Sequence, residues 1–267
     1  MGTRKNPLVN SEYYHIYNRG NSKMEIFKTE DDYNRFIKML FLCNSEKKIN
    51  FRTDIVEKNI DAWDFEVGES IVSIGAWVLM PNHFHLYITG SRSKASGEKE
   101  DNISIFMQKL STAYAKYFNA KYKRTGSLFE GKFKATLIKD EIQAKYLFSY
   151  IHLNPVKLID PKWKTEGIKS KKETLDFLNK YQWSSYLDFK EKDRIESIVL
   201  NRTDFLNFFP NSELVDNEIM EWFSRSLASG EITENQIFDL KKRMNQHNPE
   251  KYHNEIDWGK SVGKEFK

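Results

Sequence analysis

The sequence has a single cysteine, no long apolar segment and no strong excess of charge of either sign. Cys43 alone cannot form an internal disulfide or a cysteine-rich zinc site, and such sparing use of cysteine is typical of a reducing compartment. No apolar run approaches the roughly 20 residues that span a bilayer. The charged start, MGTRKNPLVNSEYY, is not followed by the apolar segment of a secretory signal. We therefore expect a soluble, cytoplasmic protein with no membrane partner.

The near-balance of charge selects no class of partner, since lysine and arginine number 42 and aspartate and glutamate 38, a net charge of +4. The distribution is more informative. Nine cationic residues lie between Gln108 and Lys145 against three acidic ones, and aromatic residues are interleaved with them. Cations for phosphates and rings for unstacked bases are what a nucleic-acid groove requires. A solvated helix face whose rings belong to the core would look the same, so both interpretations stay open.

The pattern of apolar residues favours an α+β fold, and an aromatic content of 14% excludes general disorder. The chain of 267 residues has room for one large domain or two small ones, at roughly 150 residues per domain. Residues 70–89 are either two buried strands or one strand that turns at Pro81-Asn82. The other expected elements are strands over 12–18 and 132–138 and helices over 29–41, 103–120 and 140–154.

Two regions fall outside this regular pattern. Residues 43–69 carry mixed charge without a clean period, and we interpret them as an insertion with one short strand or helix. After about residue 187 the strand signals become few. We therefore expect an α+β domain over 1–187 and a helical C-terminal extension over 188–267, with helices at 218–227 and 235–244.

Two histidines are separated by one residue in Pro81-Asn82-His83-Phe84-His85. On a strand, His83 and His85 project from the same face, so two imidazoles stand side by side while Phe84 enters the opposite layer. Two neutral imidazoles so placed can hold one divalent cation. The alternative is a pair of ordinary, partly buried histidines, and the spacing alone does not separate the two.

A second candidate segment is Tyr150-Ile151-His152-Leu153-Asn154-Pro155. On a helix, Tyr150 and Asn154 are one turn apart and face the same way, whereas His152 points away from them. This helix can bring a phenol nucleophile and a third metal ligand to one place. Tyr146, one turn earlier, is a competing nucleophile, and a helix end with packed tyrosines is the structural alternative.

The ordered set of these segments resembles the REP-associated tyrosine transposases, within the single-tyrosine HUH transposases of the insertion-sequence-200-like superfamily. The resemblance covers roughly residues 12–187. It is carried by Tyr14-His15-Ile16-Tyr17-Asn18-Arg19-Gly20, Leu79-Met80-Pro81-Asn82-His83-Phe84-His85-Leu86, Arg124-Thr125-Gly126-Ser127-Leu128-Phe129-Glu130-Gly131-Lys132-Phe133-Lys134, Tyr150-Ile151-His152-Leu153-Asn154-Pro155-Val156-Lys157 and Trp183-Ser184-Ser185-Tyr186.

The resemblance implies a fold, a set of site residues and a reaction. The fold is an antiparallel-centred sheet with helices, the ferredoxin-like core of HUH nucleases. The paired metal-binding histidines fall on His83 and His85, the nucleophile on Tyr150, and the position that completes the metal site on Asn154. The implied cofactor is Mg²⁺ or Mn²⁺. The expected DNA-binding residues are Arg19, Arg124, Lys132 and Lys134.

The sequence departs from the family pattern at two places. Lys132-Phe133 stands where the glycine-rich block usually ends with arginine and an aromatic residue, so a point charge replaces a bidentate phosphate contact. Leu158-Ile159-Asp160 stands where Ala-Gly is usual. The second departure concerns the choice of DNA rather than the chemistry.

The implied activity is cleavage and rejoining of single-stranded or hairpin DNA, in a monomer or a dimer, through a 5′-phosphotyrosine intermediate. Two alternatives belong to other classes of function. A domesticated relative would bind DNA or RNA hairpins as a regulator without cutting them. A phosphodiesterase that uses water would need a carboxylate-rich centre, which neither candidate segment supplies.

Overall fold

A four-stranded antiparallel sheet forms the centre of the protein, in strand order β2-β3-β1-β4. The computed structural model describes residues 8–91, 101–190, 192–205 and 215–228. The strands are β1 (Tyr13–Arg19), β2 (Val72–Met80), β3 (His83–Gly90) and β4 (Lys134–Ile138). Helix α1 (Glu30–Cys43) connects β1 to β2, and α2 (Asn102–Lys121) connects β3 to β4. This βαββαβ order is the ferredoxin-like arrangement, so the expected α+β fold is confirmed.

The strand pairing resolves the two interpretations of residues 70–89. Strands β2 and β3 form an antiparallel hairpin in which Met80 lies opposite His83, with Pro81 and Asn82 as the connection. The hairpin carries both histidines at the start of β3. The two-strand interpretation is therefore right.

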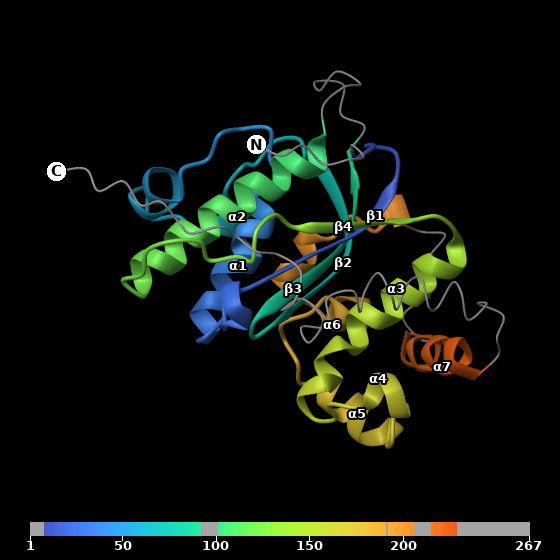
Figure 1. Ribbon diagram of the computed structural model, residues 1–267. Helices are drawn as coiled ribbons and strands as arrows, with labels where there is room; N and C mark the ends of the chain where they lie inside the picture. Colours follow the sequence, from blue (N-terminus) through green and yellow to red (C-terminus); the bar gives the residue numbers. More distant parts are fainter. Residues whose placement is uncertain (1–7, 92–100, 191, 206–214, 229–267) are drawn as a thin grey trace, which may run out of the picture. The chain divides into compact units, whose positions relative to one another are not determined.

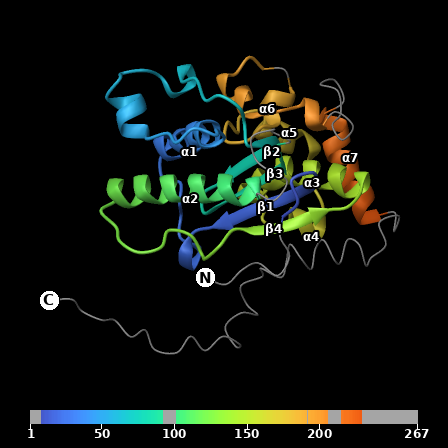
Figure 2. The same cartoon turned by 90° about the horizontal axis from the view of Figure 1, so that it is seen from above.

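The two faces of the sheet are covered by different helices (Figures 1 and 2). Side chains alternate along each strand, so Ile16 of β1 and Phe84 and Leu86 of β3 point to one face. There they form the main core with apolar residues of α1 and α2, such as Phe36 and Phe106. The opposite face of the same strands carries the histidines.

Helix α3 (Glu141–Leu153) lies against the histidine face and contacts β2 and β3. It continues into the 3-10 helix η4 (Asn154–Leu158), followed by α4 (Trp163–Glu166), α5 (Lys171–Leu178) and α6 (Tyr186–Phe189). Figure 1 shows these elements on the side of the sheet away from α1 and α2.

The Trp183-Ser184-Ser185-Tyr186 segment fixes α3 to the edge of the sheet. The Ser185 N–H donates to the Trp77 carbonyl at 2.9 Å, and the Trp77 N–H donates to Ser185 Oγ at 2.9 Å. His152 of α3 lies 2.8 Å from the same Oγ through its Nε2. His152 therefore points away from the Tyr150 side of the helix, as expected, and this segment covers the β2 edge.

The remaining described segments surround this core. In the insertion, a π-helix, η2 (Arg52–Val56), and a 3-10 helix, η3 (Ala62–Asp64), pack in a small cluster with Leu42. The other short 3-10 helices are η1 (Asn21–Lys23), η5 (Ile195–Val199) and η6 (Thr203–Phe205). Among the described residues, no helix has the length and hydropathy needed to cross a bilayer.

The helix expected at 218–227 is confirmed as α7 (Val215–Ala228), whereas the one at 235–244 lies outside the described residues. The described residues up to Arg225 form one compact unit. Its C-terminal part is tied to the α3 layer, since the Tyr186 hydroxyl donates to Asp216 of α7 at 2.6 Å. The domain boundary at 187 remains a prediction.

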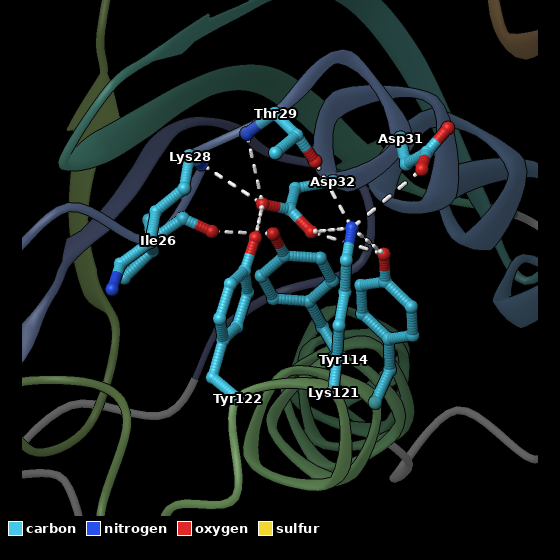
Figure 3. Close-up of polar contacts among 9 residues, drawn as sticks. Ile26, Lys28, Thr29, Asp31, Asp32, Tyr114, Lys121 and Tyr122 are labelled. Atoms are coloured by element: carbon cyan, nitrogen blue, oxygen red, sulfur yellow. Dashed lines mark hydrogen bonds and ion pairs between the residues drawn. The ribbon is translucent and has the colours of Figure 1, made fainter.

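A buried carboxylate joins α1 to α2 (Figure 3). Asp32 is fully buried at the start of α1, and its Oδ2 accepts the backbone N–H groups of Lys28 and Thr29. The Asp32 carboxylate also accepts hydrogen bonds from Tyr122 at 2.6 Å, through Oδ2, and from Lys121 at 2.8 Å and Tyr117 at 3.0 Å, through Oδ1. Burial alone would raise the pKa of Asp32, but these bonds outweigh it and lower the pKa to about 2.

Asp32→Asn is expected to lower the free energy of unfolding by roughly 2–3 kcal/mol, because it leaves the Lys121 ammonium without its buried partner. Asp31→Asn is the matched control. It removes the same charge from a side chain that is 85% exposed and 3.8 Å from the same ammonium, and should cost less than about 0.5 kcal/mol. Urea unfolding at pH 7 measures both. Equal effects would show that Asp32 does not join the helices.

Candidate active site

Three histidines meet on the sheet face that α3 covers. His83 and His85 lie on the same face of β3, as the spacing predicts. The third, His15 of β1, was not predicted: its Nε2 lies 2.8 Å from His85 Nδ1, and the two rings stack. His83 Nδ1 lies 2.6 Å from Asn82 Oδ1, and because that oxygen only accepts, His83 carries its proton on Nδ1. The Nε2 lone pair of His83 is then available to a ligand.

Helix α3 presents Tyr150 to these histidines. The Tyr150 ring lies 5.5 Å from the His85 ring and 6.1 Å from the His15 ring, between ring centroids. The Tyr146 ring has its one described ring contact with Tyr150, at 6.4 Å. Of the two tyrosines on this helical face, Tyr150 is therefore the one brought to the histidines.

Asn154 lies at the C-terminal end of α3, beside both His83 and Tyr150. Its amide raises the pKa of His83 and lowers that of Tyr150, against larger opposite effects of burial on each. Asn154 is buried, and neither its Oδ1 nor its Nδ2 forms a hydrogen bond of good geometry among the described residues, although the amide lies close enough to His83 and Tyr150 to shift their pKa values by hydrogen bonding. A buried amide with such poor hydrogen bonds is costly, which favours a ligand at this position.

Two imidazoles and this amide oxygen fit a divalent cation with open coordination positions. This donor set is typical of a divalent cation but does not select Mg²⁺ or Mn²⁺ among the divalent metals. Within the described ranges, no group of three or more His, Cys, Asp or Glu side chains is arranged to hold a metal, and the third donor here is an amide.

Burial keeps the imidazoles neutral. It lowers the pKa of His83 to about 3, helped by the positive charges of Lys164 and Lys157, and it lowers the pKa of His85 well below the usual range. The neutral imidazole is the form that binds cations. Burial also raises the pKa of Tyr150 to about 12, so its phenol is protonated at neutral pH and needs assistance to act as a nucleophile.

Sequence reasoning missed Lys164, which lies in α4. Its Nζ donates to the Tyr150 hydroxyl at 2.9 Å and lies 4.3 Å from the centroid of the Tyr150 ring. Lys164 belongs to none of the motif blocks, and the irregular chain between η4 and α4 separates it from Tyr150. No spacing rule could have found it. His15, in contrast, stands in the Tyr14–Gly20 block, but its place beside His85 depends on the long-range pairing of β1 with β3.

The four expected DNA-binding residues are not on one surface. Arg19 lies opposite His83 in the strand register, and its guanidinium forms a bidentate ion pair with Glu130. Lys134 is exposed and pairs with Tyr17, which places it on the histidine face, and Lys132 is exposed just before β4. Arg124 follows α2, in the helix layer on the other side of the sheet. Its Nη1 donates to Asn119 Oδ1 at 3.3 Å.

The basic, aromatic stretch over 108–145 is likewise divided. Tyr114 and Phe118 of α2 are fully buried in the main core, so the core interpretation is right for them. Lys109 donates to carbonyls of the insertion, and Lys121 pairs with Asp32. The stretch is therefore divided between the core, contacts with the insertion and the histidine face, where Lys134 of β4 lies.

Comparison with known proteins returns transposases. No protein-family model and no curated protein matches the chain. A solved REP-associated tyrosine transposase bound to a REP hairpin is similar, at 15% identity and a TM-score of 0.43 over 73% of this chain and 90% of that one. A Deinococcus radiodurans R1 protein provisionally assigned as a transposase is similar at 12% identity and a TM-score of 0.29, over 55% of this chain and 92% of that one. Both TM-scores lie below 0.5, so function has to be inferred from the side chains of the site.

Proposed function

We propose that this protein is a DNA transesterase of the tyrosine transposase type, which cleaves and rejoins single-stranded or hairpin DNA. The observation that carries the proposal is the meeting of the Tyr150 phenol with two neutral imidazoles and a poorly hydrogen-bonded buried amide in one place. The imidazoles come from β3, the phenol comes from α3, and the amide belongs to the first residue of η4. A core built for stability alone would avoid such a collection of poorly satisfied polar groups.

Each residue has a distinct task in the reaction. The Tyr150 Oη attacks the scissile phosphorus in line, forming an O–P bond while the bond from phosphorus to the 3′ oxygen breaks. The downstream strand stays attached through a 5′-phosphotyrosine, and the upstream strand ends in a 3′-hydroxyl. Attack by a 3′-hydroxyl on that linkage rejoins DNA without a nucleotide cofactor. A divalent ion held by His83, His85 and Asn154 would supply charge neutralisation at the phosphate.

A covalent-trapping experiment tests the proposal. The downstream fragment carries the tyrosine, so the hairpin oligonucleotide is labelled at its 3′ end and incubated with the full chain and Mn²⁺. A labelled band that survives denaturation and maps to one tyrosine peptide supports the transesterase. Bound hairpin without an adduct would indicate the non-cleaving regulator, and released fragments without an adduct would indicate a hydrolase that uses water.

The β4 cations are expected to bind the DNA backbone. Lys132→Gln with Lys134→Gln should weaken hairpin binding and reduce the slope of log affinity against log salt by up to about 0.7–0.9 per lost phosphate contact. Lys48→Gln with Lys58→Gln is the matched control, because it removes the same charge from exposed residues of the insertion. Fluorescence anisotropy over a salt series measures both pairs.

Two outcomes of this series would revise the proposed DNA path. If the control pair changes the slope as much as the β4 pair, binding is not localised to the histidine face. Arg124→Gln is measured alone as a further arm. If it alone weakens binding, the DNA passes over the α2 layer instead.

A further inference from the structure

Lys164 of α4 differs from the lysines that flank this helix. Lys162 and Lys169 are largely exposed and form ion pairs with Glu166. Lys164 is half-buried, and its partners among the described residues are the Tyr150 hydroxyl and the rings of Tyr150 and Trp163. Trp163 is fully buried, so it anchors the short helix and holds the lysine in place. In the described part of the chain no carboxylate forms an ion pair with Lys164. Its Nζ instead donates a hydrogen bond to the hydroxyl of Tyr150, the proposed nucleophile.

We propose that Lys164 is a catalytic residue that takes the phenol proton of Tyr150 during cleavage and returns it during rejoining; this inference rests on the proposed function. In cleavage the neutral amine accepts the proton while Oη bonds to phosphorus, and the departing 3′ oxygen takes a proton from solvent. In rejoining, the attacking 3′-hydroxyl loses its proton to solvent. The departing phenolate then takes the proton of the Lys164 ammonium, so the two steps balance.

The surroundings of Lys164 favour an amine that exchanges protons near neutral pH. Burial lowers the pKa of Lys164 to about 8, so a substantial fraction is neutral at pH 7–8. The charged and titratable groups that face it from the packed elements are neutral imidazoles, a second lysine and the phenol itself: His15 of β1, His83 and His85 of β3, Lys157 of η4 and Tyr150 of α3. None of these is a carboxylate that would hold the ammonium form.

The test compares Lys164→Met, Lys164→Arg and the matched control Lys162→Met in single-turnover adduct formation on the labelled hairpin. Lys164→Met should bind the hairpin like the wild type and form adduct about 10²-fold more slowly at pH 7.5. Lys164→Arg keeps the charge but cannot accept a proton, so it should be equally slow. The wild-type rate should rise with pH to a plateau above about 8, and this inflection should be absent from both variants. Lys162→Met should behave like the wild type.

Each of the other outcomes would overturn a defined part of the proposal for Lys164. An undiminished rate in Lys164→Met, with adduct formed by the wild type, overturns the role of Lys164 alone. Rescue by arginine overturns proton transfer and leaves a purely electrostatic contact. No adduct in the wild type overturns the proposed function together with this inference. Urea unfolding of each variant separates slow chemistry from a damaged fold, and a slow Lys164→Met that is also unfolded counts against the proposal unless Lys164→Arg is folded and slow.

Discussion

Tyr150→Phe is expected to bind the hairpin like the wild type and to form no covalent adduct, whereas Tyr146→Phe should still form one. The two tyrosines occupy the same face of α3 one turn apart, and both are buried, so the substitutions remove the same atom from similar surroundings. Only Tyr150 has its hydroxyl on Lys164 and its ring beside His85. Denaturing gels of each variant with the 3′-labelled oligonucleotide measure the adduct.

The opposite result would be equally clear. An adduct that survives in Tyr150→Phe and disappears in Tyr146→Phe would mean that the wrong tyrosine has been chosen, and with it the wrong third ligand, since Asn154 is placed by its position one turn after Tyr150. If both variants lose the adduct, their free energies of unfolding decide whether the loss reflects the chemistry or a damaged fold. Loss of the Tyr150 hydroxyl removes one partner of the Lys164 ammonium, and urea unfolding detects any cost to the fold.

The parts of this site that could be predicted are those governed by short-range periodicity. Strand alternation places His83 and His85 together, and the helical repeat places Tyr150 and Asn154 together, because both patterns depend only on residues a few positions apart. The same rules predicted the sheet strands and the three helices that pack against them. The hairpin at Pro81-Asn82 needed the strand pairing to be resolved.

The parts that could not be predicted depend on pairing across the chain. His15 reaches His85 only because β1 lies beside β3, 70 residues away in sequence. Arg19 is an expected phosphate ligand whose charge is shared with Glu130, a partner 111 residues away. The basic stretch over 108–145 looked continuous in sequence, but the sheet separates α2 on one face from α3 and Lys134 on the other. Distances of this kind are set by topology, which local pattern does not determine.

His83→Ala and His85→Ala are each expected to lower adduct formation by roughly 10²–10³-fold or more, because each removes one of the three groups that can hold a divalent cation at the phosphate. Chelation of divalent ions should have the same effect on the wild type. Isothermal titration with Mn²⁺ provides a readout that does not depend on activity, and both variants should lose the binding isotherm. Hairpin binding at the β4 cations should change little, since neither histidine carries charge at neutral pH.

His15→Gln provides the graded comparison for this experiment. It keeps His83, His85 and Asn154 and alters only the group that contacts His85 Nδ1, so it should weaken Mn²⁺ binding by roughly 10–100-fold rather than abolish it. High Mn²⁺ should then restore adduct formation in His15→Gln but not in His85→Ala. Undiminished activity in both alanine variants would remove the metal assignment, and with it the explanation for the poorly hydrogen-bonded amide of Asn154. Loss of activity with unchanged Mn²⁺ binding would instead assign the histidines to contacts with the phosphate itself.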